Sequence, residues 1–409
     1  MKVLIVLAAF AVTLVLSEKV SYDNYKVYRV FPNTIEQVNF LRHLEQTDTQ
    51  LDFWTYVKNN GQHVDIMVPP QKIGEFEKQL DFQKIHFQIN INDVQKLLDK
   101  VDVGTRRDKT YGWDTFYNVE ETYAWLRSLA TSHADKAKVF SIGKSYERRD
   151  ILAIKISTGG TKKAVLLDGG IHAREWSSVS TATYLINELL NSQDPQIQNL
   201  ANSYDWYIIP ILNPDGYEYS HTTERFWRKT RQPYGECFGA DPNRNYDYEW
   251  LGTGQSAEPC LMQYAGPKPF SEPETQAHAD FARSIGKNLK VYLTLHSYGQ
   301  VLMYPYAYTW KDAENVKDYE LISDAAVKAL SKRFGTEYKH GSIFSTMSAA
   351  FGSSIDWMFG DQNVPLTFVY ELRDRDDLDP KEIIPCAQEI IDSLISLFQT
   401  ASDLGYFKN

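Results

Sequence analysis

The sequence has little that would suit binding to nucleic acid or crossing a membrane. Its 409 residues contain no Lys/Arg-rich run and carry a net charge of −10, so we expect no nucleic-acid partner. Beyond the first residues, no apolar run reaches the ~20 residues that a membrane-spanning helix needs. The sequence also has no internal repeat and no low-complexity tract, which argues against a repeat architecture.

Cysteine is scarce as well, with three residues in the chain. Their spacings do not match a cysteine metal cluster. Cys237 and Cys260 flank a loop rich in Gly, Pro and Asn, and we predict that they form a disulfide, which secretion would permit. Closing a loop of this size should contribute ~3 kcal/mol to stability. Cys386 lies in an amphipathic pattern that predicts a C-terminal helix, so we expect a buried, inert thiol.

The first 17 residues, MKVLIVLAAFAVTLVLS, combine a lysine with an apolar run that ends in small or polar residues. This pattern is typical of a cleaved secretory signal peptide. The alternative is a membrane anchor, but the apolar run is shorter than the ~20 residues that a membrane-spanning helix needs. We therefore expect a secreted, extracellular protein. The sequence has no Asn-x-Ser/Thr sequon, so we expect no N-glycosylation.

Residues 18–107 predict a small domain of their own. Strand-like segments, among them LDFWTYV, and helix-like segments follow one another in the order β-α-β-β-α-β, which is typical of a ferredoxin-like α+β fold. A linking helix comes next, and then a polar segment that contains Arg106, Arg107 and Lys109. An exposed basic segment between two folded units suits proteolytic cleavage. The alternative interpretation is an ordinary linker.

Residues 108–409 predict a larger α/β domain. Short apolar strands alternate here with longer helical segments. Buried strands separated by helices indicate a mixed, mostly parallel, twisted sheet with helices on both faces. In such sheets, ligands bind in the crevice beyond the carboxyl ends of the strands.

Polar residues stand at those strand ends. His172 and Glu175 follow AVLLDGG, His296 ends KVYLTLH, and Glu371 ends PLTFVYE. Two histidines and one glutamate are a known ligand set for catalytic zinc, which takes three protein ligands and leaves one position open. An isolated His-x-x-Glu pair is common by chance, so the prediction depends on the third ligand, His296, and on the surrounding motifs.

Seven strings occur in order along the chain: HAREW, NPDGYEYS, FWRKTRQ, DPNRNYDYEW, LTLHSYGQ, GSSIDW and YELRDRD. Together they resemble the zinc metallocarboxypeptidases, specifically the secreted digestive procarboxypeptidases of the pancreatic A/B type. The resemblance implies a signal peptide (1–17), an activation pro-domain with a linking helix (18–107) and a catalytic domain (108–409). It also implies a zymogen with one zinc ion per chain that removes single residues from peptide or protein C-termini.

The resemblance gives a role to each residue of the chemical centre. His172, Glu175 and His296 match the zinc ligands, and Glu371 matches the general base, a role that typically contributes ~10²–10⁴-fold to the rate. Arg228 matches the arginine that polarises the scissile carbonyl and stabilises the oxyanion.

Further residues match the family's substrate-binding and supporting positions. Asn243 and Arg244 match the pair that binds the terminal carboxylate, for which a planar guanidinium is suited. Asp241 matches the carboxylate that orients the first zinc histidine. The neighbouring subsites are matched by Arg174, Ser297 and Tyr298. We interpret the other arginines of these strings as members of surface ion pairs: Arg231, Arg373 and Arg375.

The pocket residues imply a substrate preference. The position of Ile355 in GSSIDW separates substrate classes in this family, and enzymes for basic residues carry an acid there. An apolar floor rejects Lys or Arg because burying an unpaired charge costs several kcal/mol. The remaining matched pocket positions are all apolar: Met303, Ile343, Met347 and Ala350. We therefore predict cleavage of aromatic or large aliphatic C-terminal residues.

One position departs from the family pattern. The family carries a mobile tyrosine where this chain has Ser348, so we expect activity to persist with weaker closure over the substrate. Phe351, one turn away, is a candidate for a substitute lid. Two other functions stay open: a non-catalytic, zinc-containing peptide-binding relative, which Ser348 alone favours, and a zinc amidohydrolase for a non-peptide substrate, against which Asn243 and Arg244 argue.

The resemblance also bears on partners and location. We expect activation by a trypsin-like protease that cuts near Arg106, Arg107 or Lys109. We expect a monomer in the extracellular space, with the digestive lumen as one location, and no nucleic-acid or membrane partner.

Overall fold

The structure is a computed structural model that describes residues 19–55, 57–58, 62–99, 110–252, 256–373 and 379–408. The predicted signal peptide (1–17) and the predicted cleavage segment with Arg106, Arg107 and Lys109 lie outside the described residues. Within the described residues, no helix has both the length and the apolar character needed to cross a membrane.

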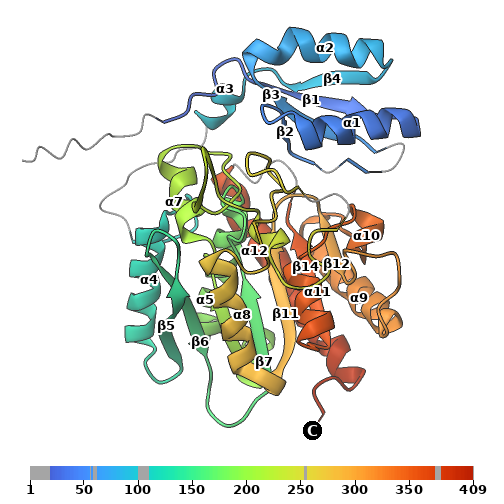
Figure 1. The fold of residues 1–409 in the computed structure, drawn as a ribbon. Coiled ribbons are helices and arrows are strands. Elements are labelled where there is room, and N and C mark those ends of the chain that lie inside the picture. Colours follow the sequence, from blue (N-terminus) through green and yellow to red (C-terminus); the bar gives the residue numbers. More distant parts are fainter. Residues whose placement is uncertain are drawn as a thin grey trace, which may run out of the picture.

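The N-terminal domain is built on a four-stranded antiparallel sheet with strand order β2-β3-β1-β4 (blue in Figure 1). Two helices share one apolar core with the strands. The elements are β1 (Lys26–Phe31), α1 (Ile35–Thr47), β2 (Asp52–Phe53), β3 (Val64–Val68), α2 (Ile73–Phe82), β4 (His86–Ile91) and the linking helix α3 (Val94–Leu98). This order and topology confirm the predicted ferredoxin-like fold.

Strand β2 is much shorter than the strand predicted over LDFWTYV. Thr55 Oγ1 accepts a hydrogen bond from the backbone N–H of Asp65 at 2.8 Å. Trp54 still donates its backbone N–H to the Asp65 carbonyl at 2.8 Å, but the Asp65 N–H is bound by a side chain instead of a backbone carbonyl, and the strand ends at Phe53.

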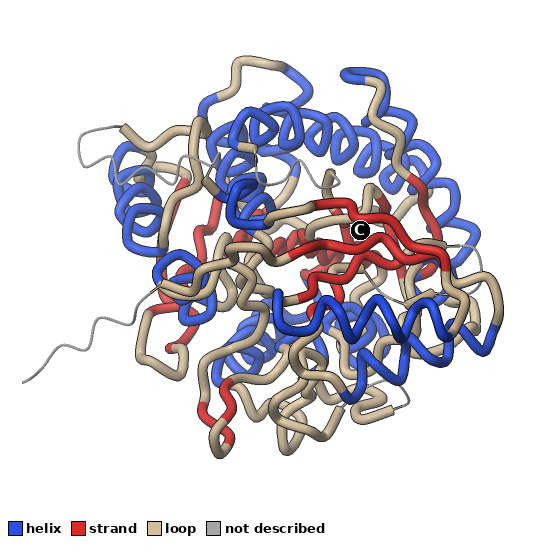
Figure 2. The backbone as a smooth tube through the Cα atoms, turned by 90° about the horizontal axis from the view of Figure 1, so that it is seen from above, coloured by secondary structure: helices blue, strands red, loops and turns tan. Residues whose placement is uncertain are grey.

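An eight-stranded mixed sheet forms the centre of the larger domain, with strand order β13-β12-β14-β11-β7-β8-β6-β5 (Figures 1 and 2). Four of the seven strand pairs are parallel, which confirms the predicted mixed, mostly parallel sheet. The strands are β5 (Ala137–Lys144), β6 (Asp150–Ile156), β7 (Ala164–Asp168), β8 (Asp205–Ile209), β11 (Leu289–His296), β12 (Val301–Tyr304), β13 (Lys339–Ser342) and β14 (Leu366–Glu371).

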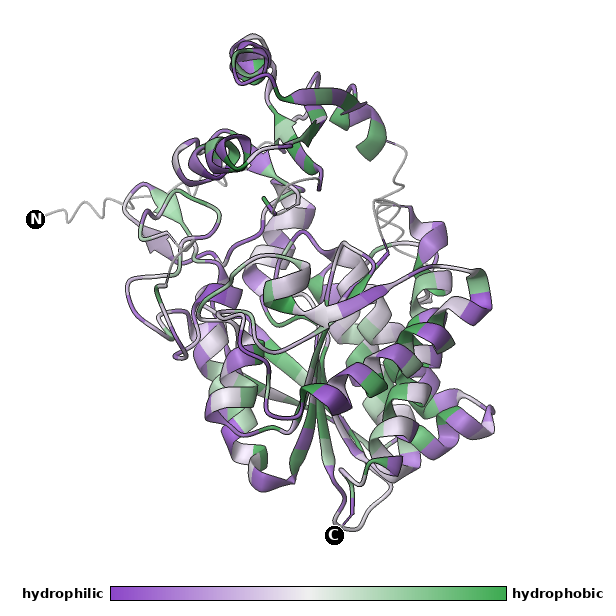
Figure 3. Ribbon diagram, turned by 90° about the vertical axis from the view of Figure 1, so that its right-hand side faces the viewer, coloured by the Kyte–Doolittle hydropathy of each residue, from purple (hydrophilic) through white to green (hydrophobic). Residues whose placement is uncertain are grey.

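Helices cover both faces of this sheet because its strands bury both faces. In β7, Val165 and Leu167 belong to one apolar core, whereas Ala164 and Leu166 belong to another, as the two-residue period of a strand requires. Figure 3 shows the central strands of the sheet mostly in green, the hydrophobic end of the scale. The helices are α4 (Val119–Ser132), α5 (Trp176–Asn191), α6 (Pro195–Ser203), α7 (Pro214–Thr222), α8 (Pro273–Ile285), α9 (Val316–Phe334), α10 (Ile343–Thr346), α11 (Ser354–Asp356) and α12 (Ile383–Asp403).

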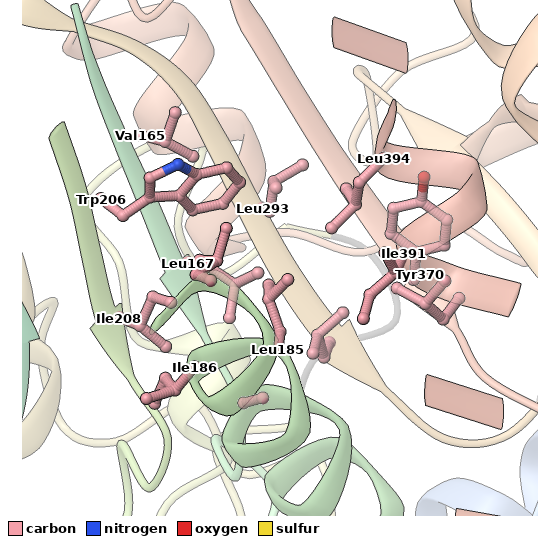
Figure 4. Close-up of a cluster of buried hydrophobic side chains, with 14 of the residues drawn as sticks. Val165, Leu167, Leu185, Ile186, Trp206, Ile208, Leu293, Tyr370, Ile391 and Leu394 are labelled. Atoms are coloured by element: carbon pink, nitrogen blue, oxygen red, sulfur yellow. The ribbon is translucent and has the colours of Figure 1, made fainter. Parts of the chain in front are cut away.

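The two cores have different partners. Figure 4 shows the first one, in which Leu185 of α5 and Leu394 of α12 pack beside Leu293 of β11. The second core packs Ala279 of α8 and Trp357 against the opposite face of the strands. All five side chains are essentially inaccessible to solvent, so the central strands are clamped between helices and form the rigid part of the molecule.

The cysteine predictions are confirmed. Cys237 of the short strand β10 (Cys237–Phe238), which pairs with β9 (Pro233–Tyr234), forms a disulfide with Cys260. Cys386 is a free, buried thiol in α12, and burial raises its pKa to about 12.

Candidate metal and substrate site

The strand register brings distant parts of the sequence to one edge of the sheet. Strands β11 and β14 are parallel neighbours, and His296 lies opposite Glu371 in their ladder. On its other side β11 pairs with β7, which leads into the turn that carries His172 and Glu175. Gly170 in this turn has a φ of 61°, a conformation that glycine adopts without strain. The predicted residues therefore meet at the carboxyl ends of adjacent parallel strands, as expected for such sheets.

Three side chains converge with their ligand atoms toward one point. His172 Nδ1 lies 2.8 Å from Glu175 Oε1, and His296 Nδ1 lies 3.1 Å from Glu175 Oε2. The two Nδ1 atoms are 3.1 Å apart. Two nitrogen ligands of a tetrahedral zinc ion with bonds of ~2.0–2.1 Å would lie ~3.3 Å apart, so this donor set fits zinc. Across the described residues this is the one His/Cys/Asp/Glu group close enough to share a metal ion.

Asp241 and Arg228 form a chain of polar contacts on the Nε2 side of His172. Asp241 Oδ1 lies 3.2 Å from His172 Nε2, and Arg228 donates to Asp241 Oδ2 through Nη2 at 2.9 Å and through Nε at 3.1 Å. Burial favours a neutral Asp241, but Arg228 and His172 outweigh it and hold the carboxyl pKa well below its usual range. The ionised carboxylate accepts from Nε2–H, which leaves the Nδ1 lone pair facing Glu175.

Glu371 lies at the end of β14 with 7% of its surface exposed. Burial raises the pKa of its carboxyl, His296 opposes this rise, and the nearby carboxylate of Glu175 adds to it. The positive charge of Arg228 also lowers the pKa of Glu371, and Arg228 Nη1 lies 3.7 Å from Glu175 Oε1. A carboxyl group that titrates at raised pH beside a metal set is suited to moving protons.

Asn243 and Arg244 lie on a 3₁₀ turn (Pro242–Arg244) that Asp241 caps. Asp241 Oδ1 accepts from the backbone N–H of Asn243 at 2.9 Å. The Asn243 amide oxygen in turn accepts from the backbone N–H of Ser354 at 2.9 Å. Arg244 is 5% exposed and donates to the Asn243 carbonyl at 2.8 Å. The turn thus presents a buried guanidinium next to the metal set.

A small pocket of about 30 Å³ lies between the metal set and Arg244. Its apolar wall is a separate hydrophobic cluster with contributions from β12, β14, α10 and α11. All of the predicted pocket residues line it: Met303, Ile343, Met347, Ser348, Ala350 and Ile355. Sequence analysis missed Val369, which also lines the pocket. The signal for it was present, because a residue two positions before Glu371 in a strand points to the same side.

Phe351 is not placed as a substitute lid, contrary to our expectation. Its ring packs against the backbone of Gly252, where a Cβ would lie 2.0 Å from Phe351 Cδ1. The ring centroid lies 6.3 Å from that of Tyr308, and Phe351 is not among the described residues that line the pocket. The ring is held beside this loop because glycine leaves room for it there.

Two arginines of the motif strings have structural contacts of different kinds. Arg373 forms ion pairs, to Glu389 at 2.6 Å and to Glu382, but the pair with Glu389 is buried and not on the surface as predicted. Arg231 was predicted to form an ion pair, but its guanidinium stacks on aromatic rings, at 3.6 Å from the Tyr219 centroid. Ring faces attract cations without an acidic partner. Arg375 lies outside the described residues.

The N-terminal domain covers the crevice at this end of the sheet (top of Figure 1). A cleft of about 1160 Å³ remains between the domains and is lined by Arg174, Ser297, Tyr298 and Glu371 on one side. Arg174 Nη1 donates to both carboxylate oxygens of Asp52, at 2.8 and 2.9 Å. Sequence analysis did not predict this contact, and no local pattern marks Asp52.

Comparison with known proteins agrees with the resemblance in the motif strings. The family model of the zinc carboxypeptidase domain matches residues 122–393, and that of the carboxypeptidase activation peptide matches residues 28–101. Zinc carboxypeptidase A 1 of Drosophila melanogaster is 40% identical, over 98% of this chain and 97% of that protein. Carboxypeptidase B of Rattus norvegicus is 34% identical, over 91% of each chain.

A solved structure has the same architecture. The crystal structure of carboxypeptidase A from Helicoverpa armigera has a TM-score of 0.87, with 27% identity over 95% of this chain and 100% of that chain. Relatives named for both A and B types occur, so the likeness alone does not set the substrate preference. The chain belongs to the zinc carboxypeptidase family, as a precursor that carries the family's activation peptide ahead of a metallocarboxypeptidase domain.

Proposed function

We propose that the chain is a secreted zinc exopeptidase that removes single C-terminal residues and prefers aromatic or large aliphatic side chains. One observation carries this proposal: a single pocket borders two metal ligands, Glu371, Arg244 and the apolar wall at Ile355. A C-terminal residue needs these features together, since its carboxylate, side chain and peptide bond are bound at once.

The chain's own residues divide the reaction between them. His172, Glu175 and His296 would hold the zinc ion, which when bound would supply Lewis-acid chemistry and a bound water with a pKa lowered toward ~7. Glu371 takes a proton from the attacking water as the new C–O bond forms, and gives it to the amine as the C–N bond breaks. Arg228 stabilises the negative charge that develops on the carbonyl oxygen.

Substrate orientation comes from the other side of the pocket. Arg244, with Asn243, binds the free terminal carboxylate, because a guanidinium can donate to both carboxylate oxygens. Arg174, Ser297 and Tyr298 bind the residues before the scissile bond. This arrangement also argues against an amidohydrolase for substrates without a terminal acid, since the buried guanidinium would then lack its partner.

We also propose that the precursor consists of a signal peptide (1–17), an activation segment (18–107) and the enzyme (108–409). The contact of Asp52 with Arg174 supports inhibition by the activation segment, because it occupies a substrate-binding arginine. A trypsin-like cut near Arg106, Arg107 or Lys109 would free the crevice of a monomeric enzyme. The disulfide supports passage through an oxidising compartment.

Hydrolysis of two blocked dipeptides, one ending in Phe and one in Arg, tests the proposal. The full-length protein is assayed before and after trypsin treatment, with and without a zinc chelator. We expect release of Phe that trypsin increases and the chelator abolishes. Faster release of Arg would contradict the preference, and full activity before trypsin treatment would contradict the zymogen. A protein that holds zinc but cleaves neither substrate would be a peptide-binding relative.

Ile355→Asp should invert the substrate preference. The side chain is 1% exposed, so an aspartate there would place a buried charge against the apolar residue of the substrate. We expect kcat/KM for the Phe substrate to fall by ~10²-fold and that for the Arg substrate to rise. Ile355→Val keeps the apolar wall and serves as the control. If the Asp variant still preferred Phe, Ile355 would not determine specificity.

Ser348→Tyr should tighten binding of small peptides. Ser348 lines the pocket, and a tyrosine there could cover the bound side chain. An aromatic contact contributes ~0.5–1.5 kcal/mol, so we expect KM to fall by ~2–10-fold with little change in kcat. Ser345→Tyr, at an exposed serine of the neighbouring helix α10, is the control. An unchanged KM would show that closure over the pocket is not limited by Ser348.

A further inference from the structure

The side of His296 opposite the metal set faces a buried polar chain. His296 Nε2 lies 3.2 Å from Thr294 Oγ1, and Thr294 Oγ1 lies 2.7 Å from Asp168 Oδ1. None of the three residues is more than 2% exposed. Thr294 and His296 lie on the same side of β11, two residues apart, and Thr294 pairs with Asp168 in the parallel ladder of β11 and β7. The sheet therefore fixes all three positions.

The hydrogens of this chain can be assigned from donor and acceptor capacity. An ionised carboxylate accepts only, and a threonine hydroxyl has one proton to donate. Thr294 therefore donates to Asp168, and its oxygen accepts from Nε2–H of His296. This places the His296 proton on Nε2 and leaves the Nδ1 lone pair on the side of Glu175, 3.1 Å from Glu175 Oε2.

We propose that Asp168 and Thr294 are positioning residues for the metal, forming a carboxylate–hydroxyl relay that holds His296 in the tautomer and orientation that bind zinc. The inference rests on the proposed role of His296 as a ligand. It completes a pattern in the site: Asp241 contacts Nε2 of His172 directly at 3.2 Å, whereas Asp168 reaches Nε2 of His296 through a hydroxyl. Partners of this kind fix the ring and raise its affinity for metal.

The neighbouring His278 does not replace the relay. His278 Nε2 lies 3.6 Å from Asp168 Oδ2, which is too long for a hydrogen bond. Its Nδ1 lies 2.6 Å from the Tyr246 hydroxyl, and burial lowers its pKa to about 3. This imidazole is therefore neutral and offers Asp168 no counter-charge. Removing the Thr294 hydroxyl would leave both His296 Nε2 and Asp168 Oδ1 buried without the bond they share now.

Zinc affinity of the full-length precursor tests the relay. The dissociation constant is measured by competition with a chelator of known affinity for Thr294→Val, Thr294→Ser and a control, Thr367→Val. Thr367 is a fully buried threonine of β14 whose hydroxyl contacts Tyr319 and not the metal set. We expect Thr294→Val to weaken zinc binding by ~10–100-fold, Thr294→Ser to restore it, and Thr367→Val to leave it unchanged.

A second measurement keeps the test decisive if Thr294→Val does not fold. Asp168→Asn keeps the side-chain shape but loses the charge, and we expect weaker zinc binding. In the metal-free precursor, ¹⁵N NMR should show His296 protonated on Nε2, with the signal assigned by its loss in His296→Gln. Zinc affinity of Thr294→Val or Asp168→Asn within twofold of the parent would overturn the relay. If Thr294→Val and Asp168→Asn lose zinc affinity as expected but the trypsin-treated parent hydrolyses neither peptide, the proposed function is contradicted while the relay stands.

Discussion

Glu371→Gln is expected to lower kcat for the Phe dipeptide by ~10²–10⁴-fold while the protein keeps its zinc. Glutamine preserves the shape of the side chain at the end of β14 but cannot take a proton from water. The parent needs a deprotonated Glu371, whose pKa burial raises, so its rate should rise with pH through that titration. This acidic limb of the pH–rate profile should disappear in the variant.

Steady-state kinetics and metal analysis of the trypsin-treated protein check this result. Glu320→Gln is a suitable control, because Glu320 is exposed in α9 and lines neither the small pocket nor the cleft between the domains. A Glu371→Gln enzyme with kcat within fivefold of the parent would assign the proton transfer to another group. Loss of zinc from the variant would instead point to a structural role for this carboxylate.

Arg244→Ala should lower kcat/KM by about 30- to 4000-fold, mainly through KM. Removing one partner of a buried, hydrogen-bonded charge pair costs ~2–5 kcal/mol. Arg244 lines the small pocket beside the metal set, where it is the proposed partner of the substrate carboxylate. Arg244→Lys keeps the charge but not the fork-shaped donor pair, and we expect an intermediate loss.

A substrate with an amidated C-terminus separates this role from a general loss of structure. The parent should cleave the amide far more slowly than the free acid, because the amide carries no charge for Arg244. In Arg244→Ala the two substrates should be cleaved at similar low rates, so the effects of the two changes would not add. Equal cleavage of acid and amide by the parent would rule out a carboxylate-binding role for Arg244.

The sequence predicts those elements of the fold whose hydrophobic period is strong. Helix α12 and strands β11 and β14 are all found where their patterns place them. Strand β2 is shorter than predicted because Thr55 bonds the backbone of the partner strand, and side-chain competition of this kind leaves no periodic signal. The register between neighbouring strands cannot be predicted from local sequence patterns either, because the pairing of His296 with Glu371 joins strands that are far apart in sequence.

The candidate site also contains features that the sequence predicts and features that it does not. Motif strings predict the metal set and Arg244, since these residue types are needed by the chemistry itself. Contacts between packed surfaces could not be predicted, and Asp52 against Arg174 is one of them. The position of Phe351 on Gly252 is another, because it depends on how two loops fit together.

Because His296 and Glu371 are paired in one ladder, the residues that carry out the reaction are held by a different part of the molecule from those that select the substrate side chain. Backbone hydrogen bonds of the central sheet set the spacing between a metal ligand and the proton-transferring carboxylate. The segments that line the pocket around Ser348 and Ile355 lie outside those strands. Mutations in these segments can therefore change which substrate side chain is accepted without moving the reacting groups. The substrate preference can evolve while the catalytic step is kept.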